Sequence, residues 1–119
     1  MAFADIKKVL NDAMAAWAAA HGQADLPSVH RSQSFPALAG DFSKVDLLNG
    51  QARGRPLIQP DVVGPTQGPP WGTKGNQANL VLVLRGQLPG FPQMPYRGPY
   101  LDDGRIDTIA DWIDHGCPD

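Results

Sequence analysis

Residues 100–119 read "YLDDGRIDTIADWIDHGCPD", and they contain the clearest helix signal in the chain. One apolar stripe at helical spacing contains Ile106, Ile109, Ala110 and Ile113, with Trp112 at its margin. Residues spaced by three and four positions share one face of a helix. Asp102 or Asp103 can cap this helix at its start, and Gly116 and Pro118 can end it. The chain is therefore predicted to finish with an amphipathic helix.

A second amphipathic helix is predicted at the N-terminus, from about residue 3 to residue 20. Its apolar stripe consists of Ile6, Val9, Leu10, Ala13, Met14 and Trp17. Gly22 supplies a stop signal directly after the Ala-rich end. Both terminal helices carry an apolar face that needs a partner, and we expect the two faces to pack together.

The region between the terminal helices is dense in turn-forming residues. Residues 50–100 contain nine Gly and nine Pro, which leaves little room for long regular elements. "SKVDLLNGQARG", residues 43–54, predicts a short helix capped by Ser43. The middle of the chain is therefore expected to consist of short elements joined by long Pro/Gly-rich loops.

A second short inner helix is predicted from "NQANLVLVLRG", residues 76–86. Asn76 or Asn79 can cap it, and Gly86 can end it. Periodicity alone also permits a strand, because the Val- and Leu-rich run alternates little.

Bulk composition limits the classes of function. The 119 residues suit a single domain, residues 1–119. A net charge of -2 and a pI of about 5.8 provide no basic field for nucleic acid. The N-terminal apolar run is interrupted by Asn11 and Asp12, so it predicts neither a signal peptide nor a membrane span. The single Cys117 excludes an intrachain disulfide, and we expect a cytoplasmic protein.

Charge is unevenly distributed along the chain. Residues 102–119 hold six Asp against one Arg, so the first 101 residues carry a net +3. Asp107, Asp111 and His115 follow one another at four-residue spacing on one face of the last helix. This row could dock a partner or collect a divalent cation, but a solvated acidic face is favoured because three ligands over two turns are too spread for one ion.

Met94 lies in an unusually stiff loop, "PGFPQMPYRGPYLDD", residues 89–103. Methionine usually fills irregular gaps in a core, where no rigid backbone is needed. The Pro-rich frame therefore indicates either that Met94 is presented to a ligand or that it packs under neighbouring aromatic rings. Packing is favoured, because Phe91, Tyr96 and Tyr100 are close in sequence.

The order of these C-terminal motifs resembles the end of a small class I cytochrome c. "NLVLVLRG", then "MP" in a Gly/Pro loop, then the final "WI" helix matches that family's short helix, axial-methionine loop and last helix. The resemblance covers residues 76–118 and, loosely, the first helix. It implies a mainly α, cytochrome c-like fold with crossed N- and C-terminal helices and two short inner helices. It also implies that Met94 stands at the position of an axial haem ligand.

The chain departs from that family at the haem-attachment motif. The family's CxxCH aligns with "WAAAHG", residues 17–22, where Trp17 and Ala20 occupy the cysteine positions and His21 matches the ligand. Covalent haem attachment there is impossible. The resemblance therefore implies either a scaffold without haem, or haem held non-covalently by Met94 with His21 or His30.

These observations lead to a prediction of function. Short motifs for nucleophilic, phosphate-binding or zinc-dependent catalysis are absent, so we do not expect an enzyme. We expect a haem-free interaction module or accessory subunit that binds a protein partner or itself and carries no cofactor. Its predicted partner-binding residues are Tyr96, Arg97, Asp107 and Asp111. Arg53, Arg55, Arg85 and Arg97 could form a basic rim around the Met94 loop. The alternative is an electron-transfer protein with non-covalent haem between His21 and Met94.

Overall fold

The structure, a computed structural model, describes residues 2–21, 42–52, 55–60, 62, 74–94 and 99–119; for Ala18, His21 and Ala52 it describes the backbone alone. The elements in these ranges are α1 (Phe3–His21), α3 (Lys44–Asn49), β1 (Gln51–Ala52), β2 (Arg55–Pro56), the 3-10 turn η2 (Gly75–Gln77), α4 (Asn79–Arg85) and α5 (Asp103–Asp114). The predicted mainly helical class is confirmed for the described residues.

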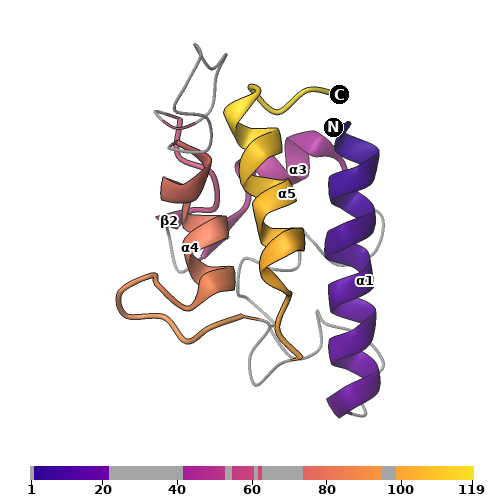
Figure 1. Ribbon diagram of the computed structural model, residues 1–119. Coiled ribbons are helices and arrows are strands. Elements are labelled where there is room, and N and C mark those ends of the chain that lie inside the picture. The colour runs from indigo at the N-terminus through magenta and orange to yellow at the C-terminus, as the bar shows by residue number, and fades with distance from the viewer. Residues whose placement is uncertain (1, 22–41, 53–54, 61, 63–73, 95–98) are drawn as a thin grey trace.

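The two terminal helices lie side by side and run in opposite directions, with α4 on the other side of α5 (Figure 1). At one end of this contact the ring of Trp112 lies 6.1 Å from that of Phe3, the first residue of α1. The contact between the two terminal helices is confirmed, whereas the crossed, cytochrome c-like arrangement stays a prediction. The apolar stripes account for this contact, because both follow the length of their helices.

Helix α3 begins at a complete capping box. The Ser43 hydroxyl accepts from the Asp46 backbone N–H at 3.1 Å, and the Asp46 carboxylate accepts from the Ser43 backbone N–H at 2.9 Å. The predicted cap at Ser43 is therefore confirmed. After Gly50, β1 pairs with β2 in a short antiparallel ladder that the sequence analysis did not predict.

Residues 79–85 form a helix, so the alternative interpretation as a strand is wrong. The predicted caps Asn76 and Asn79 are also wrong: the cap residue is Ala78, which has no side-chain capping bond. The Gln59 side chain instead accepts from the Asn79 backbone N–H at 2.9 Å, and the Asn79 side chain donates to the Pro56 carbonyl at 2.8 Å. The segment that contains Pro56 and Gln59 thus supplies the hydrogen-bond partners at the start of α4. Its end has the predicted Gly86, with φ of 74°.

The core lies between α5 and the elements around it. Its members from α5 are Ile106, Ile109, Ala110, Trp112 and Ile113, and α4 contributes Leu80, Val81, Val83 and Leu84. Because α4 buries residues on most of its sides, it needs cover from several elements. The same buried cluster contains Leu57, Ile58 and Leu88, which precede and follow α4 in the sequence.

Candidate functional site

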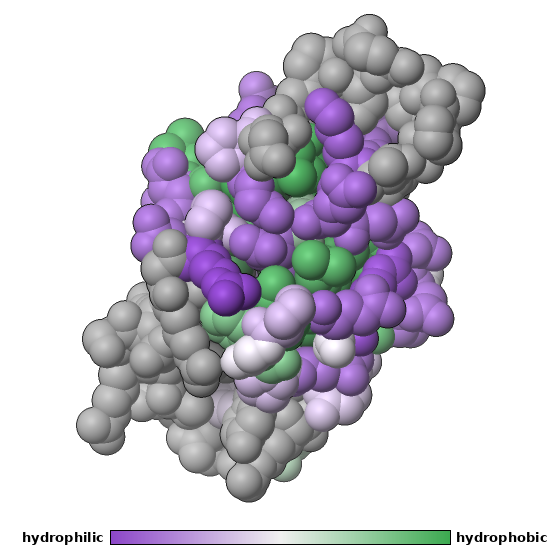
Figure 2. Space-filling view, turned by 90° about the vertical axis from the view of Figure 1, so that its left-hand side faces the viewer, coloured by the Kyte–Doolittle hydropathy of each residue, from purple (hydrophilic) through white to green (hydrophobic). Residues whose placement is uncertain are grey.

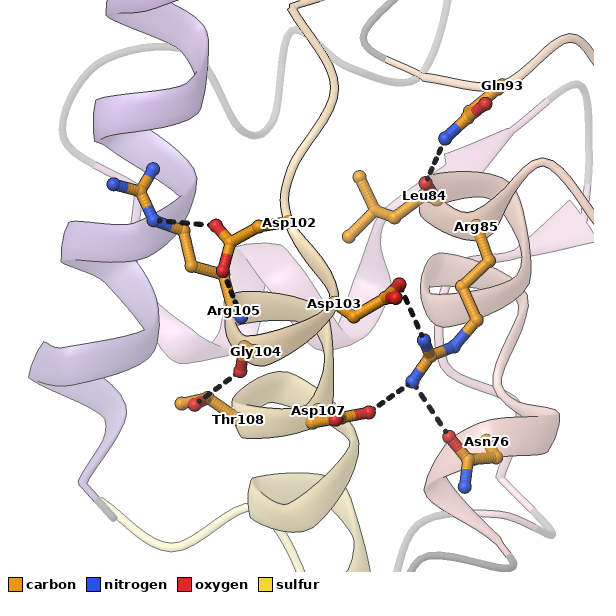
Figure 3. A network of polar contacts seen from close by, with 10 residues as sticks. All are labelled: Asn76, Leu84, Arg85, Gln93, Asp102, Asp103, Gly104, Arg105, Asp107 and Thr108. Atoms are coloured by element: carbon orange, nitrogen blue, oxygen red, sulfur yellow. Dashed lines mark hydrogen bonds and ion pairs between the residues drawn. The ribbon is translucent and has the colours of Figure 1, made fainter.

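The loop that carries Met94 is bonded to the end of α4. The backbone N–H of Met94 donates to the Val83 carbonyl at 3.0 Å, and the Gln93 side chain donates to the Leu84 carbonyl at 3.2 Å (Figure 3). The Gln87 N–H donates to the Leu82 carbonyl at 2.8 Å. The last carbonyls of a helix lack partners within it, so this loop satisfies groups that would otherwise need water. That role gives a structural reason for the stiff frame.

The Met94 side chain is half-buried and packs against the hydrophobic core. Phe91, also half-buried, packs against the same core. A thioether in such surroundings is satisfied by dispersion contacts and needs no metal partner.

Several predicted site residues fall outside the described residues. His30, Tyr96, Arg97 and Arg53 lie outside those ranges, and for His21 the structure gives only the backbone, at the end of α1. The proposed pairing of His21 with Met94 and the contribution of Tyr96 and Arg97 to a binding surface therefore stay predictions. Trp17, which aligns with the first attachment cysteine, is buried on α1.

Arg85 links three elements of the fold. Its guanidinium lies 2.6 Å from the Asp107 carboxylate and 3.5 Å from that of Asp103, both on α5, and it donates to the Asn76 side chain at 3.2 Å (Figure 3). Arg85 itself is half-buried, whereas both aspartates are exposed. The interpretation of Arg85 as part of an open basic rim is therefore wrong, because its charge is used to hold α4 and η2 against α5.

Arg55 has different surroundings from Arg85. Its side chain is exposed, and its guanidinium lies 5.4 Å from the centre of the Phe91 ring. A cation over an aromatic face is attracted by the ring quadrupole. Arg55 and Phe91 therefore form a surface area near β2 and α4 that is partly charged and partly apolar. Figure 2 shows this side of the molecule, where apolar residues lie between polar ones.

The predicted acidic row on α5 is only partly an open surface. Asp107 is exposed and pairs with Arg85, as described above. Asp111 is exposed and lies 3.7 Å from the His115 ring nitrogen, which also contacts the Asp111 carbonyl at 2.7 Å. Among the described residues, no group of three His, Cys, Asp or Glu side chains is arranged to hold a metal ion.

Asp114 has a structural role that was not predicted from the sequence. This residue is 1% exposed, and its Oδ1 accepts from the Gly75 backbone N–H at 2.7 Å. Among the described residues its Oδ2 has no hydrogen-bond partner. Its position could have been found, because Asp114 follows Ala110 by one helical turn and so continues the buried stripe of α5.

Comparisons of the chain with protein-family models, curated proteins and solved structures found no match. Among the described elements, every helix is too short or too polar to cross a membrane.

Proposed function

We propose that the chain is a haem-free interaction module with a cytochrome c-like arrangement, without catalysis of its own. The observation that supports this best is the setting of Met94. Its backbone is hydrogen-bonded to Val83 and its side chain packs on the core, so both the stiff loop and the thioether have structural roles. A buried Trp17 in place of the first attachment cysteine agrees with a scaffold that does without the porphyrin.

The surface of α5 is the part of the described chain best suited to a partner. Asp103, Asp107 and Asp111 are all exposed on this helix. Arg85 lies 2.6 Å from the Asp107 carboxylate and 3.5 Å from that of Asp103, so these two acids already have a basic neighbour. The exposed Asp111 side chain, which has no arginine or lysine beside it among the ion pairs of the described residues, is open to a basic partner. We therefore expect complementary charge to contribute to both the rate and the specificity of association.

Association should be measurable with the purified protein by sedimentation velocity and by cross-linking, with and without cell extract. We expect self-association or a captured partner, and we expect Asp111→Lys to weaken that association at least tenfold. Asp12→Lys is the matched control, because Asp12 is similarly exposed and also has a basic side chain four residues away, Lys8. A chain that stays monomeric and cross-links to nothing would contradict the proposal, as would equal effects of the two variants.

A second candidate is electron transfer with non-covalent haem, with His21 and Met94 as axial ligands. It is favoured by the incomplete burial of Met94, whose backbone is held in place by Val83. A thioether ligand raises the potential of haem iron, which suits electron transfer.

Titration with haemin separates the two candidates. A haem-free module gives no sharp Soret shift at stoichiometric haemin. The electron-transfer protein gives a shift that His21→Ala and Met94→Ala abolish and that Met14→Ala leaves unchanged. Met14 is a suitable control because it, too, is half-buried and packs against the core, but from α1.

A further inference from the structure

The chain after α5 folds back over the helix end through two left-handed residues. Gly116 has φ of 83°, and Cys117 has φ of 56°. Glycine adopts this conformation freely, whereas in Cys117 it costs roughly 1–2 kcal/mol. The Cys117 N–H donates to the Trp112 carbonyl at 3.1 Å, so the turn closes the last carbonyls of the helix.

Three further contacts hold this segment down. The Trp112 indole N–H donates to the Pro118 carbonyl at 2.9 Å. Lys44, the first residue of α3, donates to the Cys117 carbonyl at 3.1 Å and pairs with the Asp119 carboxylate. Lys44 is thus the contact between this segment and an element more than seventy residues earlier in the chain.

The segment covers groups that would otherwise meet water. The Cys117 side chain is 2% exposed and Trp112 is fully buried. Trp112 lies beside Phe3, which in turn packs edge-on against Phe42. The Cys117 thiol packs inward from the turn, although it lies beyond the last helix.

Burial raises the pKa of Cys117 from 9.0 to about 11, and the nearby charge of Lys44 lowers it only in part. The thiolate is the reactive form of cysteine. The closed segment therefore lowers the fraction of Cys117 present as thiolate at pH 8 by roughly 100-fold relative to a solvated thiol. It also keeps reagents away from the sulfur atom.

We propose that residues 116–119 are a releasable strap, latched by Lys44, that controls access to the Cys117 thiol and to the Trp112 face of the core. The strap is a separate feature from the proposed binding function. Its outer contact is weak, since the Asp119 side chain is 93% exposed and such ion pairs contribute little. The strain at Cys117 further lowers the cost of opening. Release therefore requires only local unfolding, in which Cys117 leaves the core while α5 and the other core residues stay packed.

Thiol labelling of the full chain with an aromatic disulfide reagent at pH 8 tests the strap. The thiol reports the motion, since this sequence contains no other cysteine. We expect slow labelling of the native protein and labelling about three- to tenfold faster in Lys44→Met, which loses both the Asp119 pair and the bond to the Cys117 carbonyl. Lys8→Met is the control, because Lys8 also holds an ion pair but lies on α1. Equal rates for Lys44→Met and the native chain would overturn the proposal.

A second measurement separates strap release from global unfolding, in case Lys44→Met destabilises the whole protein. Labelling rates are followed at low urea concentrations, and the unfolding transition is recorded in parallel. Local release exposes little surface, so the labelling rate should depend only weakly on urea. The labelling rate could instead rise with urea as steeply as global unfolding does, in both the native chain and Lys44→Met. That result would show that the strap does not open separately from global unfolding.

Discussion

Gly75→Ala should destabilise the protein by more than about 3 kcal/mol, an unusually large effect for the addition of one methyl group. A Cβ atom at Gly75 would overlap the carbonyl oxygen of Ala110 and lie 2.7 Å from its carbonyl carbon. Both atoms belong to the backbone of α5, so neither can rotate away. The substitution must push η2 off the helix, which also removes the hydrogen bond from Gly75 to Asp114.

Urea unfolding followed by circular dichroism measures this effect, with Gly90→Ala as the matched control. Gly90 has φ of 83°, but nothing lies within 4 Å of the position of its Cβ. Its substitution should cost only the conformational strain of a left-handed alanine, about 1–2 kcal/mol. A Gly75→Ala protein as stable as Gly90→Ala would show that η2 and α5 are not in tight contact.

Asp114→Ala should cost about 2–4 kcal/mol, the second-largest effect that we expect. The substitution leaves the Gly75 N–H without its acceptor in a buried setting and opens a small cavity under η2. Asp114→Asn retains an oxygen in the place of Oδ1, so it should recover at least half of that loss. The measurement is again the free energy of unfolding in urea.

Asp111→Ala is the control for Asp114→Ala, because Asp111 is an exposed aspartate on the same helix. It should change stability by about 0.5 kcal/mol at most. The explanation fails if Asp114→Asn costs as much as Asp114→Ala, since the bond to Gly75 would then not be the source. Combining Gly75→Ala with Asp114→Ala should give less than the sum of the single effects, because both disrupt one contact.

Local signals explain why the helices could be predicted from the sequence. Asp102 caps α5 as predicted, with its side chain accepting from the Arg105 N–H at 3.3 Å. Ser43 and Gly86 also lie where the sequence places them, as cap residues of α3 and α4. Each of these signals involves residues within four positions of one another, so a single sequence carries all the information.

The contacts that hold the candidate site involve residues far apart in sequence, and these were not predicted. Gln59 closes the start of α4 from twenty positions away. Lys44 reaches Cys117 across most of the chain, and Arg85 is neutralised by α5. Periodicity indicates which face of a helix is buried, but it does not indicate which polar group of another segment will meet it.

Both ends of α4 depend on other segments, and this dependence has a consequence for how the chain acquires its structure. A seven-residue helix is too short to persist in water by itself. Its first N–H groups bond to Leu57 and Gln59, and its last carbonyls accept from the Met94 loop. The helix can thus form only when two loops close around it, so its appearance during folding marks tertiary assembly rather than an early local event.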